Sequence, residues 1–449
     1  MSRHKGKRWD GNVRDAALSI LLSVERDQAY SNLLLNRTIE TYGLEDKDRA
    51  LLTELTYGTL QHRMTLDYHL EPFIRGKLED WVRELLRLSA YQIVYLTKIP
   101  AHAAVNEAVE IAKRRGHKGI ASMVNGILRS FLRKGPREIG GGLTWEKQTS
   151  IETSHPEWMI RRWAEQYGRE TALEMAHANN EPPIQTLRVN RTKTEREEVL
   201  GMLGEEGFLA EPSPILFDAI RVRGGNAARS RAFKEGFVTI QDESSMLPVM
   251  ALDPAPGMKV LDMCAAPGGK TTHIAERLDN TGEVRAYDLH PHKVKLIDQN
   301  AARLGLENIR TDSADSRRLT EILEPASFDR ILVDAPCSGL GVIRRKPDIK
   351  YSKTEEEIGR LPDIQKSLLE EAYHLLKPGG LLVYSTCTVD REENLLTAEA
   401  FLEAHPDLLR EDLSEMMPEG LRYEEGMLQV LPQDFGGDGF FVAAFRKLE

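Results

Sequence analysis

A stretch that runs from Lys259 to Leu278, KVLDMCAAPGGKTTHIAERL, restricts the fold more than any other part of the sequence. Its apolar start predicts a strand over Lys259–Met263, and the spacing of apolar residues from Thr271 onward predicts a helix. The loop between them is made of small residues, which let the backbone approach a ligand closely. The free N–H groups of the helix start point at such a ligand. The stretch therefore predicts a nucleotide-like cofactor, with an ordinary strand-to-helix turn as the alternative.

The loop does not match the common phosphate-binding motifs. Neither G-x-x-x-x-G-K-[ST] nor G-x-G-x-x-G occurs there with the required spacing. A second expected strand, Glu283–Tyr287, ends in Asp288, at the position where such folds bind a ribose hydroxyl. These features favour an adenosine group without a pyrophosphate.

From Gly236 onward, strands and helices alternate regularly, which predicts a parallel sheet with helices on both faces. The expected parallel strands are Lys259–Met263, Glu283–Tyr287, Asn308–Thr311, Phe328–Val333 and Gly380–Tyr384, and an antiparallel pair is expected at Leu428–Leu431 and Gly439–Phe445. Ligands bind at the carboxyl ends of the strands in such sheets. We therefore expect the functional residues at that edge.

The earlier part of the chain has a different pattern. From Asn12 to about Leu132 the apolar spacing is helical, with breaks at Gly43, Pro72, Pro100 and Gly116, which predicts a bundle of about six helices. Short strands and helices follow a Gly- and Pro-containing linker at 135–142. The sequence thus predicts a multidomain chain: an all-α bundle over 1–140, a small α+β connecting domain over 141–235, and an α/β domain over 236–449.

Charge is divided unevenly along the chain. The net charge is −10, yet residues 1–140 hold 23 Lys and Arg against 17 Asp and Glu, a net charge of +6. The basic residues gather at Arg3–Arg8, Lys113–Lys118 and Arg129–Arg137. Three clusters on one domain favour an RNA-binding face, with a merely solvated surface as the alternative for each cluster.

The composition indicates in which cellular compartment the protein is expected. Hydrophobic residues make up 41% and charged residues 29% of the chain, as in soluble globular proteins. No signal peptide and no stretch long enough to span a bilayer is apparent. The three cysteines are too few for a disulfide framework. We expect a cytoplasmic monomer that binds neither a membrane nor a metal.

Two further motifs follow expected strands. Phe328–Val333 leads into Asp334-Ala335-Pro336-Cys337-Ser338-Gly339, and Gly380–Tyr384 leads into Ser385-Thr386-Cys387-Thr388. If these strands are neighbours, Asp334, Cys337 and Cys387 meet above the cofactor loop. A lone cysteine is more often a small buried apolar residue than a nucleophile. Two cysteines beside a carboxylate at the functional edge of the sheet favour a catalytic role for the cysteines over a packing role.

The runs DMCAAPGGKT, DAPCSG and STCT resemble the motifs of the S-adenosylmethionine-dependent RNA cytosine-5 methyltransferases. With an N-terminal bundle similar to the antitermination factor NusB, the chain resembles one branch of that family, the ribosomal RNA small-subunit methyltransferases B, also called Sun or Fmu. The resemblance covers essentially the whole chain. It implies a Rossmann-like class I methyltransferase domain, S-adenosyl-L-methionine as the cofactor and small-subunit ribosomal RNA as the partner.

The resemblance also implies roles for individual residues. Cys387 would be the nucleophile, and Cys337 would assist product release. In the analogous DNA enzymes the nucleophile is the Cys of the Pro-Cys pair, so spacing leaves the opposite assignment open. The cofactor contacts would come from the first loop and three acidic strand ends, with Asp312 as an alternative to Asp315: Cys264, Ala265, Ala266, Pro267, Gly268, Gly269, Lys270, Asp288, Asp315 and Asp334.

Cytosine chemistry explains why such residues are needed. C5 is a poor nucleophile until a thiolate adds at C6, which calls for an activated cysteine. Asp334, if its pKa is raised, would protonate the ring near N3, and Cys337 is the candidate base for the C5 proton. The target base must also be unstacked to enter the pocket.

Other residues have simpler interpretations. We expect His273 to lie at the surface or in packing, and Asp242 either to cap a helix or to lie near the cofactor. Arg344, Arg345 and Lys346 are hypothesised to hold the RNA backbone. Two other functions stay open: cytosine-5 methylation of transfer RNA, and a non-catalytic RNA-binding factor in ribosome assembly that keeps the fold as a scaffold.

Overall fold

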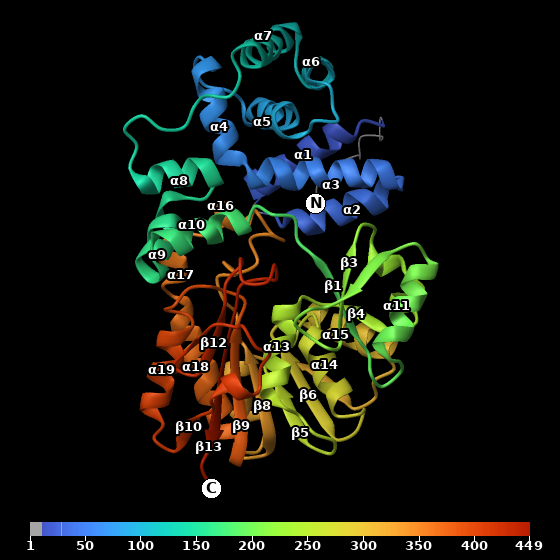
Figure 1. Cartoon of the computed structure of the whole chain (residues 1–449), viewed down its shortest axis with the longest axis vertical. Coiled ribbons are helices and arrows are strands. Elements are labelled where there is room, and N and C mark those ends of the chain that lie inside the picture. The colour runs from blue at the N-terminus through green and yellow to red at the C-terminus, as the bar shows by residue number, and fades with distance from the viewer. Residues whose placement is uncertain (1–10, 28) are drawn as a thin grey trace. The chain divides into compact units, whose positions relative to one another are not determined.

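The computed structural model describes residues 11–27 and 29–449. These form two compact units (Figure 1). The first comprises the residues up to Asn180 together with Lys346–Ser352, and the second comprises Glu181–Arg345 and Lys353–Glu449. A short segment that follows the Cys337 motif in sequence therefore belongs to the first unit. Among the described helices, none has the length and apolar character needed to cross a membrane.

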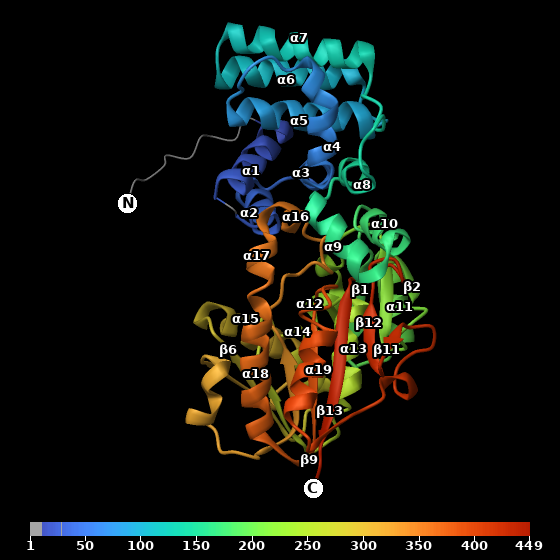
Figure 2. The same cartoon turned by 90° about the vertical axis from the view of Figure 1, so that its left-hand side faces the viewer.

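The first unit is helical. Helices α5, α6 and α7 lie side by side (Figure 2). Seven α-helices occupy residues 13–134 of the described chain, whereas the sequence predicted about six. The additional division falls at His62, between the end of α3 and the start of α4, where no Gly or Pro marks the break. The helices of this unit are α1 (Val13–Asp27), α2 (Ser31–Tyr42), α3 (Asp46–Gln61), α4 (Arg63–Leu70), α5 (Asp80–Tyr95), α6 (Ala101–Arg115), α7 (Lys118–Lys134), α8 (Trp145–Thr153), α9 (Glu157–Tyr167), α10 (Arg169–Ala178) and α16 (Ile349–Ser352), with a 3-10 turn at Glu71–Phe73.

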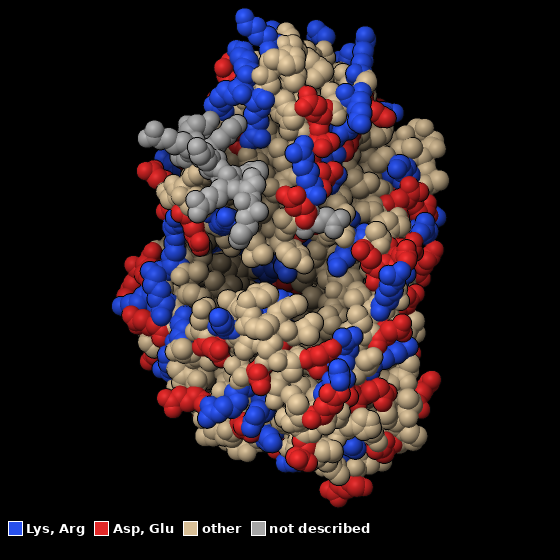
Figure 3. Space-filling model, turned by 180° about the vertical axis from the view of Figure 1, so that it is seen from behind, with Lys and Arg blue, Asp and Glu red and all other residues tan. Residues whose placement is uncertain are grey.

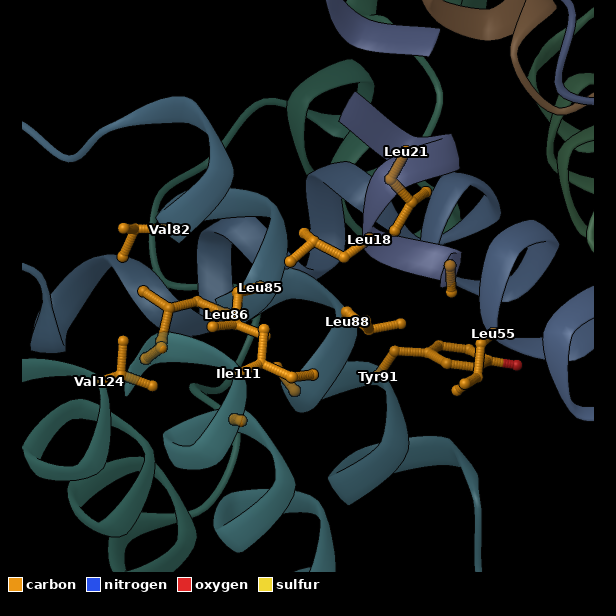
Figure 4. Packing of buried hydrophobic residues seen from close by; sticks show 14 of the residues in the cluster. Leu18, Leu21, Leu55, Val82, Leu85, Leu86, Leu88, Tyr91, Ile111 and Val124 are labelled. Atoms are coloured by element: carbon orange, nitrogen blue, oxygen red, sulfur yellow. The ribbon is translucent and has the colours of Figure 1, made fainter. Parts of the chain in front are cut away.

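The apolar residues that recur at helical spacing in the sequence form the core between these helices (Figure 4). Leu18, Leu55, Leu88 and Ile111, from four different helices, are at most 1% exposed. Each such side chain contributes about 1.5–3 kcal/mol when buried. The helical prediction for this part of the chain is confirmed.

Lys350 shows that the segment Lys346–Ser352 is integral to the first unit. Its side chain is fully buried, and Nζ donates to the carbonyl oxygens of Gln61 at 3.1 Å and Thr153 at 3.4 Å and to Oδ1 of Asn180 at 2.7 Å. Burial lowers the pKa of Lys350 well below its usual value. Because a buried polar group is costly to separate from its hydrogen-bond partners, these three contacts tie the segment to the first unit.

The second unit begins with a small antiparallel sheet of order β2-β3-β1-β4. The short strands expected after the linker are present, and the first of them is β1. The elements are β1 (Gln185–Val189), α11 (Arg196–Glu205), β2 (Leu209–Pro212), β3 (Ala219–Arg223), a 3-10 turn (Ala227–Arg229), α12 (Arg231–Lys234) and β4 (Val238–Ile240).

The large sheet has nine strands in the order β11-β12-β13-β9-β8-β5-β6-β7, with β10 paired to β13. Strands β5 to β9 pair in parallel, whereas β12 and β13 are antiparallel, as predicted. The strands are β5 (Lys259–Asp262), β6 (Glu283–Asp288), β7 (Ile309–Ser313), β8 (Phe328–Asp334), β9 (Leu376–Thr386), β10 (Leu408–Arg410), β11 (Tyr423–Glu424), β12 (Met427–Val430) and β13 (Phe440–Lys447). The helices are α13 (Glu243–Leu252), α14 (Gly269–Arg277), α15 (Pro291–Leu304), α17 (Glu355–Ile358), α18 (Leu361–Leu375) and α19 (Leu395–Ala404), with 3-10 turns at Ser316–Glu321 and Leu413–Glu415.

Helices cover both faces of this sheet (Figure 1). Alternate residues of a strand point to opposite faces. Accordingly, Val260, Leu332 and Val383 share a cluster with residues of α13 and α14, whereas Leu261, Ile331 and Leu382 share one with residues of α18 and α19. The predicted α/β architecture is confirmed.

Two glycines inside helices of the first unit allow a direct test of this packing. A Cβ atom added at Gly58 in α3 would lie 2.0 Å from Cζ of the buried Tyr91, whereas one at Gly126 in α7 would meet nothing within 4 Å. Gly58→Ala should destabilise the unit by about 1–3 kcal/mol through overpacking. Gly126→Ala should stabilise it by up to about 1 kcal/mol through helix propensity. Hydrogen exchange of the slowest amides in α5 measures both, and equal effects would contradict the packing around Tyr91.

Candidate active site

The loop of small residues that contains Pro267 and Gly268 joins β5 to α14. Gly268 has φ +100°, and a Cβ atom there would lie 3.0 Å from Cα of Ile297 in α15, so only glycine fits. Asn300 Nδ2, also in α15, donates to the carbonyl oxygen of Pro267 at 3.1 Å. The loop is thus held against α15, with the N–H groups of the first turn of α14 at its end.

Arg188 of β1 holds the start of α14 from the other side. Its guanidinium is 1% exposed and forms an ion pair with Glu276 at 2.8 Å. It also donates to the carbonyl oxygen of Gly269 at 2.8 Å and to Oγ1 of Thr272 at 3.0 Å. The sequence analysis missed Arg188, because a single arginine in a short strand carries no local signal of contacts with residues more than eighty positions away.

Acidic residues surround the loop. Asp288, the last residue of β6, accepts from the backbone N–H groups of Ala266 at 3.3 Å and His290 at 3.1 Å. The pKa of the Cys264 thiol is raised well above its usual value by burial and by Asp262, Asp334, Asp288 and Asp315. The predicted acidic strand ends therefore lie close to the loop.

Asp312 and Asp315, the two candidates for the third acidic strand end, lie at the end of β7 and just after it, and they differ in their surroundings. Asp315 contributes to the raised pKa of Cys264 and caps the following 3-10 turn. It also pairs with Arg317 at 2.6 Å, and the hydrogen bond from Arg317 is the first cause that lowers the pKa of Asp315. Asp312 is exposed, and its carboxylate accepts from the backbone N–H of Ser313 at 2.7 Å. Of the two, Asp315 is the one whose charge contributes to the raised pKa of the Cys264 thiol.

Asp334 links the loop to two strands. Its Oδ2 accepts from Nζ of Lys270 at 2.7 Å, and its Oδ1 accepts from Oγ of Ser385 at 2.8 Å. The second contact follows from the parallel register of β8 and β9, which places Asp334 opposite Ser385. The prediction that these strands are neighbours is confirmed.

The same register brings the two cysteines together. Sγ of Cys337 lies 3.4 Å from Sγ of Cys387, and neither cysteine is in a disulfide bond. The hydrogen bond to Cys387, followed by burial, raises the pKa of Cys337 well above its usual value. The two sulfurs are thus within hydrogen-bonding distance, and either can be the donor. The predicted meeting of Asp334 and both cysteines at one edge is confirmed.

The hypothesis that the basic run after Cys337 holds RNA is wrong for its first two members. Arg344 is 7% exposed and donates to backbone carbonyl oxygens, including that of Pro432 at 2.7 Å. Arg345 pairs with Asp242 at 2.5 Å and Asp438 at 2.9 Å. Lys346 is exposed and lies in the first unit.

Two further predictions can be assessed. Asp242 caps α13, because its carboxylate accepts from the backbone N–H of Ser244 at 2.9 Å. His273 is 7% exposed within α14, so it is a packed residue. In the part of the chain that the structure describes, no group of three or more His, Cys, Asp or Glu side chains could hold a metal ion.

Comparisons with known proteins identify the family of this chain. The family described as 16S rRNA methyltransferase RsmB/F matches residues 249–446, the NusB family matches residues 11–133, and the ferredoxin-like domain of RsmF/B-like methyltransferases matches residues 155–228. A Bacillus subtilis protein named probable ribosomal RNA small subunit methyltransferase B is 51% identical over 441 residues, which cover 97% of this chain and 99% of that protein. The chain belongs to the ribosomal RNA small subunit methyltransferase B family.

Other members and a solved structure extend the match. The ribosomal RNA small subunit methyltransferase B of Serratia proteamaculans is 36% identical over 444 residues, with 97% of this chain and 99% of that protein covered. The crystal structure of PH0851 superposes with a TM-score of 0.84 at 26% identity and covers 98% of this chain and 100% of that one. As a methyltransferase B, the protein combines a NusB-like helical domain, a ferredoxin-like domain and a methyltransferase domain.

Asp262 of this methyltransferase provides a test of burial at the site. The carboxyl group is fully buried below the loop, and burial raises its pKa to about 7. Because the folded pKa exceeds the unfolded one, the protonated group costs nothing at low pH, and unfolding free energy is lost as pH rises towards 7, by about 1.4 kcal/mol per pH unit. Asp262→Asn, which can still accept from Thr271, should remove this loss.

Thermal unfolding at pH 5 and pH 8 measures the difference between the two proteins. The wild type should lose more stability than Asp262→Asn between these pH values. The exposed Asp279→Asn serves as the control and should follow the wild type. Parallel pH dependences of the wild type and Asp262→Asn would show that Asp262 ionises freely in the folded state.

Proposed function

We propose that the protein transfers a methyl group from S-adenosyl-L-methionine to C5 of a cytosine in small-subunit ribosomal RNA through a covalent bond between Cys387 and C6. The observation that carries this proposal is the pair of reduced thiols 3.4 Å apart, beside an Asp334 carboxylate that is bound to Lys270. Two thiols within hydrogen-bonding distance suit a reaction in which one sulfur attacks and the other moves a proton.

The residues around the loop fit S-adenosylmethionine. Gly268 keeps the loop free of a side chain where it passes α15, and the acidic edge formed by Asp288, Asp315 and Asp334 suits ribose hydroxyls and a cationic group. The remaining contacts in this proposal come from Cys264–Lys270. When bound, the cofactor supplies an electrophilic methyl group on its sulfonium.

Cys387 performs the attack. Its thiolate adds to C6 of the base, and the pair of electrons moves onto the ring, where C5 becomes nucleophilic and charge builds near N3. Before this step, the Cys337 S–H donates to Cys387 and so stabilises its thiolate. The ammonium of Lys270 and the carboxylate of Asp334, 2.7 Å apart, hold a proton at the same edge, and this pair protonates N3.

Cys337 completes the reaction. Once Cys387 is bonded to C6, its sulfur carries no charge, so the largest cause of the raised pKa of Cys337 disappears. Cys337 can then lose its proton to solvent and, as a thiolate, take the proton from C5. The electrons of that C–H bond re-form the C5–C6 double bond and expel the Cys387 thiolate, and N3 returns its proton to the Lys270–Asp334 pair, which restores all four groups.

The helical domain is proposed to bind RNA. A cavity of about 460 Å³ on it is lined by Arg75, Arg133 and Lys134 beside the ring of Phe73, without an acidic residue in its lining. Lys and Arg side chains gather over α6 and α7 (Figure 3). Basic groups next to an aromatic ring suit single-stranded RNA, which contacts proteins through phosphates and stacked bases. In this proposal, residues 1–140 bind RNA, 141–235 connect, 236–449 catalyse, and the protein acts as a monomer.

The test uses purified protein, tritiated S-adenosylmethionine and separate pools of unmodified small-subunit RNA, large-subunit RNA and transfer RNA. We expect label in 5-methylcytidine from the small-subunit pool. Label from the transfer RNA pool would keep the chemistry and change the substrate. A lack of label from all pools, with the cofactor bound, would support a non-catalytic assembly factor.

The two cysteines make opposite predictions. Cys387→Ala should abolish methyl transfer because C6 is no longer attacked. Cys337→Ala should accumulate a covalent protein–RNA adduct, visible on a denaturing gel, because the C5 proton is no longer removed. The exposed Asp279→Ala is the control and should form no persistent adduct. An adduct in Cys387→Ala in place of Cys337→Ala would reverse the two roles.

A further inference from the structure

Both cysteine-bearing turns are held by the same two adjacent residues. Glu393 and Asn394 directly precede α19, and both are fully buried. They lie six and seven positions after Cys387, on a segment that the sequence analysis did not single out. Neither residue takes part in the reaction steps described above.

Glu393 holds the turn that carries Cys337. Its Oε2 accepts from the backbone N–H of Ser338 at 2.9 Å and from Nε2 of Gln365 at 3.0 Å. Gln365 Nε2 also donates to the carbonyl oxygen of Pro336 at 3.1 Å. One carboxylate oxygen thus fixes, directly and through Gln365, the residues on both sides of Cys337.

Asn394 holds the turn that carries Cys387 in the same way. Its Oδ1 accepts from Oγ1 of Thr386 at 2.5 Å, and its Nδ2 donates to the carbonyl oxygen of Thr388 at 3.1 Å. Nδ2 also donates to Oε1 of Gln429 at 2.9 Å, which anchors it to β12. The residues before and after Cys387 are therefore bound by a single side chain.

The two turns are also joined to each other. Oγ of Ser338 and Oγ1 of Thr388 are 2.7 Å apart. The backbone N–H of Gly341 donates to the carbonyl oxygen of Cys387 at 3.1 Å. Because Glu393 and Asn394 are consecutive, the turns that they bind are held at a fixed distance from each other, and so are the two thiols.

Stability alone does not account for these side chains. Burial is the first cause that raises the pKa of Glu393 to about 7, so the charged form is disfavoured where it stands. Its Oε1 has no hydrogen-bond partner among the described residues. Apolar residues of similar volume often pack at such positions without loss of stability. A connected polar network instead specifies one arrangement of the groups that it binds.

We propose that Glu393 and Asn394 are positioning residues that set the distance between the Cys337 and Cys387 thiols. Asn394 orients Cys387 for attack at C6, and Glu393 orients Cys337 for removal of the C5 proton. The assignment of these two steps rests on the proposed function. The effect on the thiol gap does not, and it can be measured without RNA or cofactor.

The first measurement uses phenylarsine oxide, which bridges two neighbouring thiols to give a dithioarsenite and one water. The wild type should bind one equivalent tightly, and Cys337→Ser should lose this binding. Glu393→Ala and Asn394→Ala should each weaken it by about tenfold or more, the effect of losing one or two buried hydrogen bonds. Glu393→Gln, whose carbonyl oxygen can replace Oε2 as the acceptor, should restore nearly the wild-type affinity, and the exposed neighbour Glu392→Ala is the control.

The second measurement is a single turnover with RNA and S-adenosylmethionine. Asn394→Ala should slow adduct formation, whereas Glu393→Ala should accumulate the adduct although Cys337 is intact, and Glu393→Gln should not. A merely structural defect would lower both steps alike and would not be rescued by Gln. Melting curves identify variants that do not fold, in which case Asn394→Asp, which keeps the acceptor for Thr386 and loses the donor to Thr388, takes the place of Asn394→Ala.

The outcomes separate the two proposals. Unchanged arsenical affinity in both alanine variants would overturn the positioning role, whatever the activity. Equal loss of affinity in Glu393→Gln and Glu393→Ala would also overturn it for Glu393, because charge and not geometry would then matter. Weakened arsenical binding in the alanine variants, with no methylation or adduct in the wild type, would overturn the proposed function and leave the positioning role standing.

Discussion

The parallel pairing of β8 with β9 is the constraint on which the site depends. Its register places Asp334 opposite Ser385, so the turns that follow both strands leave the sheet at the same edge. A shift of one residue would send every side chain of a strand to the other face. With the observed register, the Ser385 hydroxyl reaches Asp334 at 2.8 Å and the thiols of Cys337 and Cys387 lie 3.4 Å apart. Chemistry and fold are thus fixed by the same hydrogen-bonded pair of strands.

The sequence predicts this meeting well because the signals are local. Each motif directly follows an apolar run that reads as a strand, and parallel strands end at one edge whatever the rest of the chain does. The same holds for the small-residue loop, where Gly268 is required by its own φ and by the approach of α15. Helical spacing in the first unit is equally local, and only the division at His62, which lacks Gly or Pro, escapes it.

Contacts between distant residues cannot be predicted in this way. The run Arg344-Arg345-Lys346 has the composition of a phosphate-binding site, yet Arg345 is neutralised by Asp242 and Asp438, about a hundred positions away in either direction. Arg188 is isolated in sequence but bound to four groups of α14 and its neighbourhood. A local excess of charge therefore says little about exposure until the fold shows which carboxylates surround it.

Several buried polar groups in the second unit lie where the site needs fixed positions. Asp262 lies under the cofactor loop, Arg188 and Glu276 hold the helix after it, and Glu393 holds the Cys337 turn. Burial raises the pKa of both Asp262 and Glu393 to about 7, so each disfavours the folded state at the pH where its charge forms. A well-packed apolar residue would avoid this loss of stability. The loss therefore indicates positions where a defined distance matters more than stability, namely the loop and the turns that carry the proposed reacting groups.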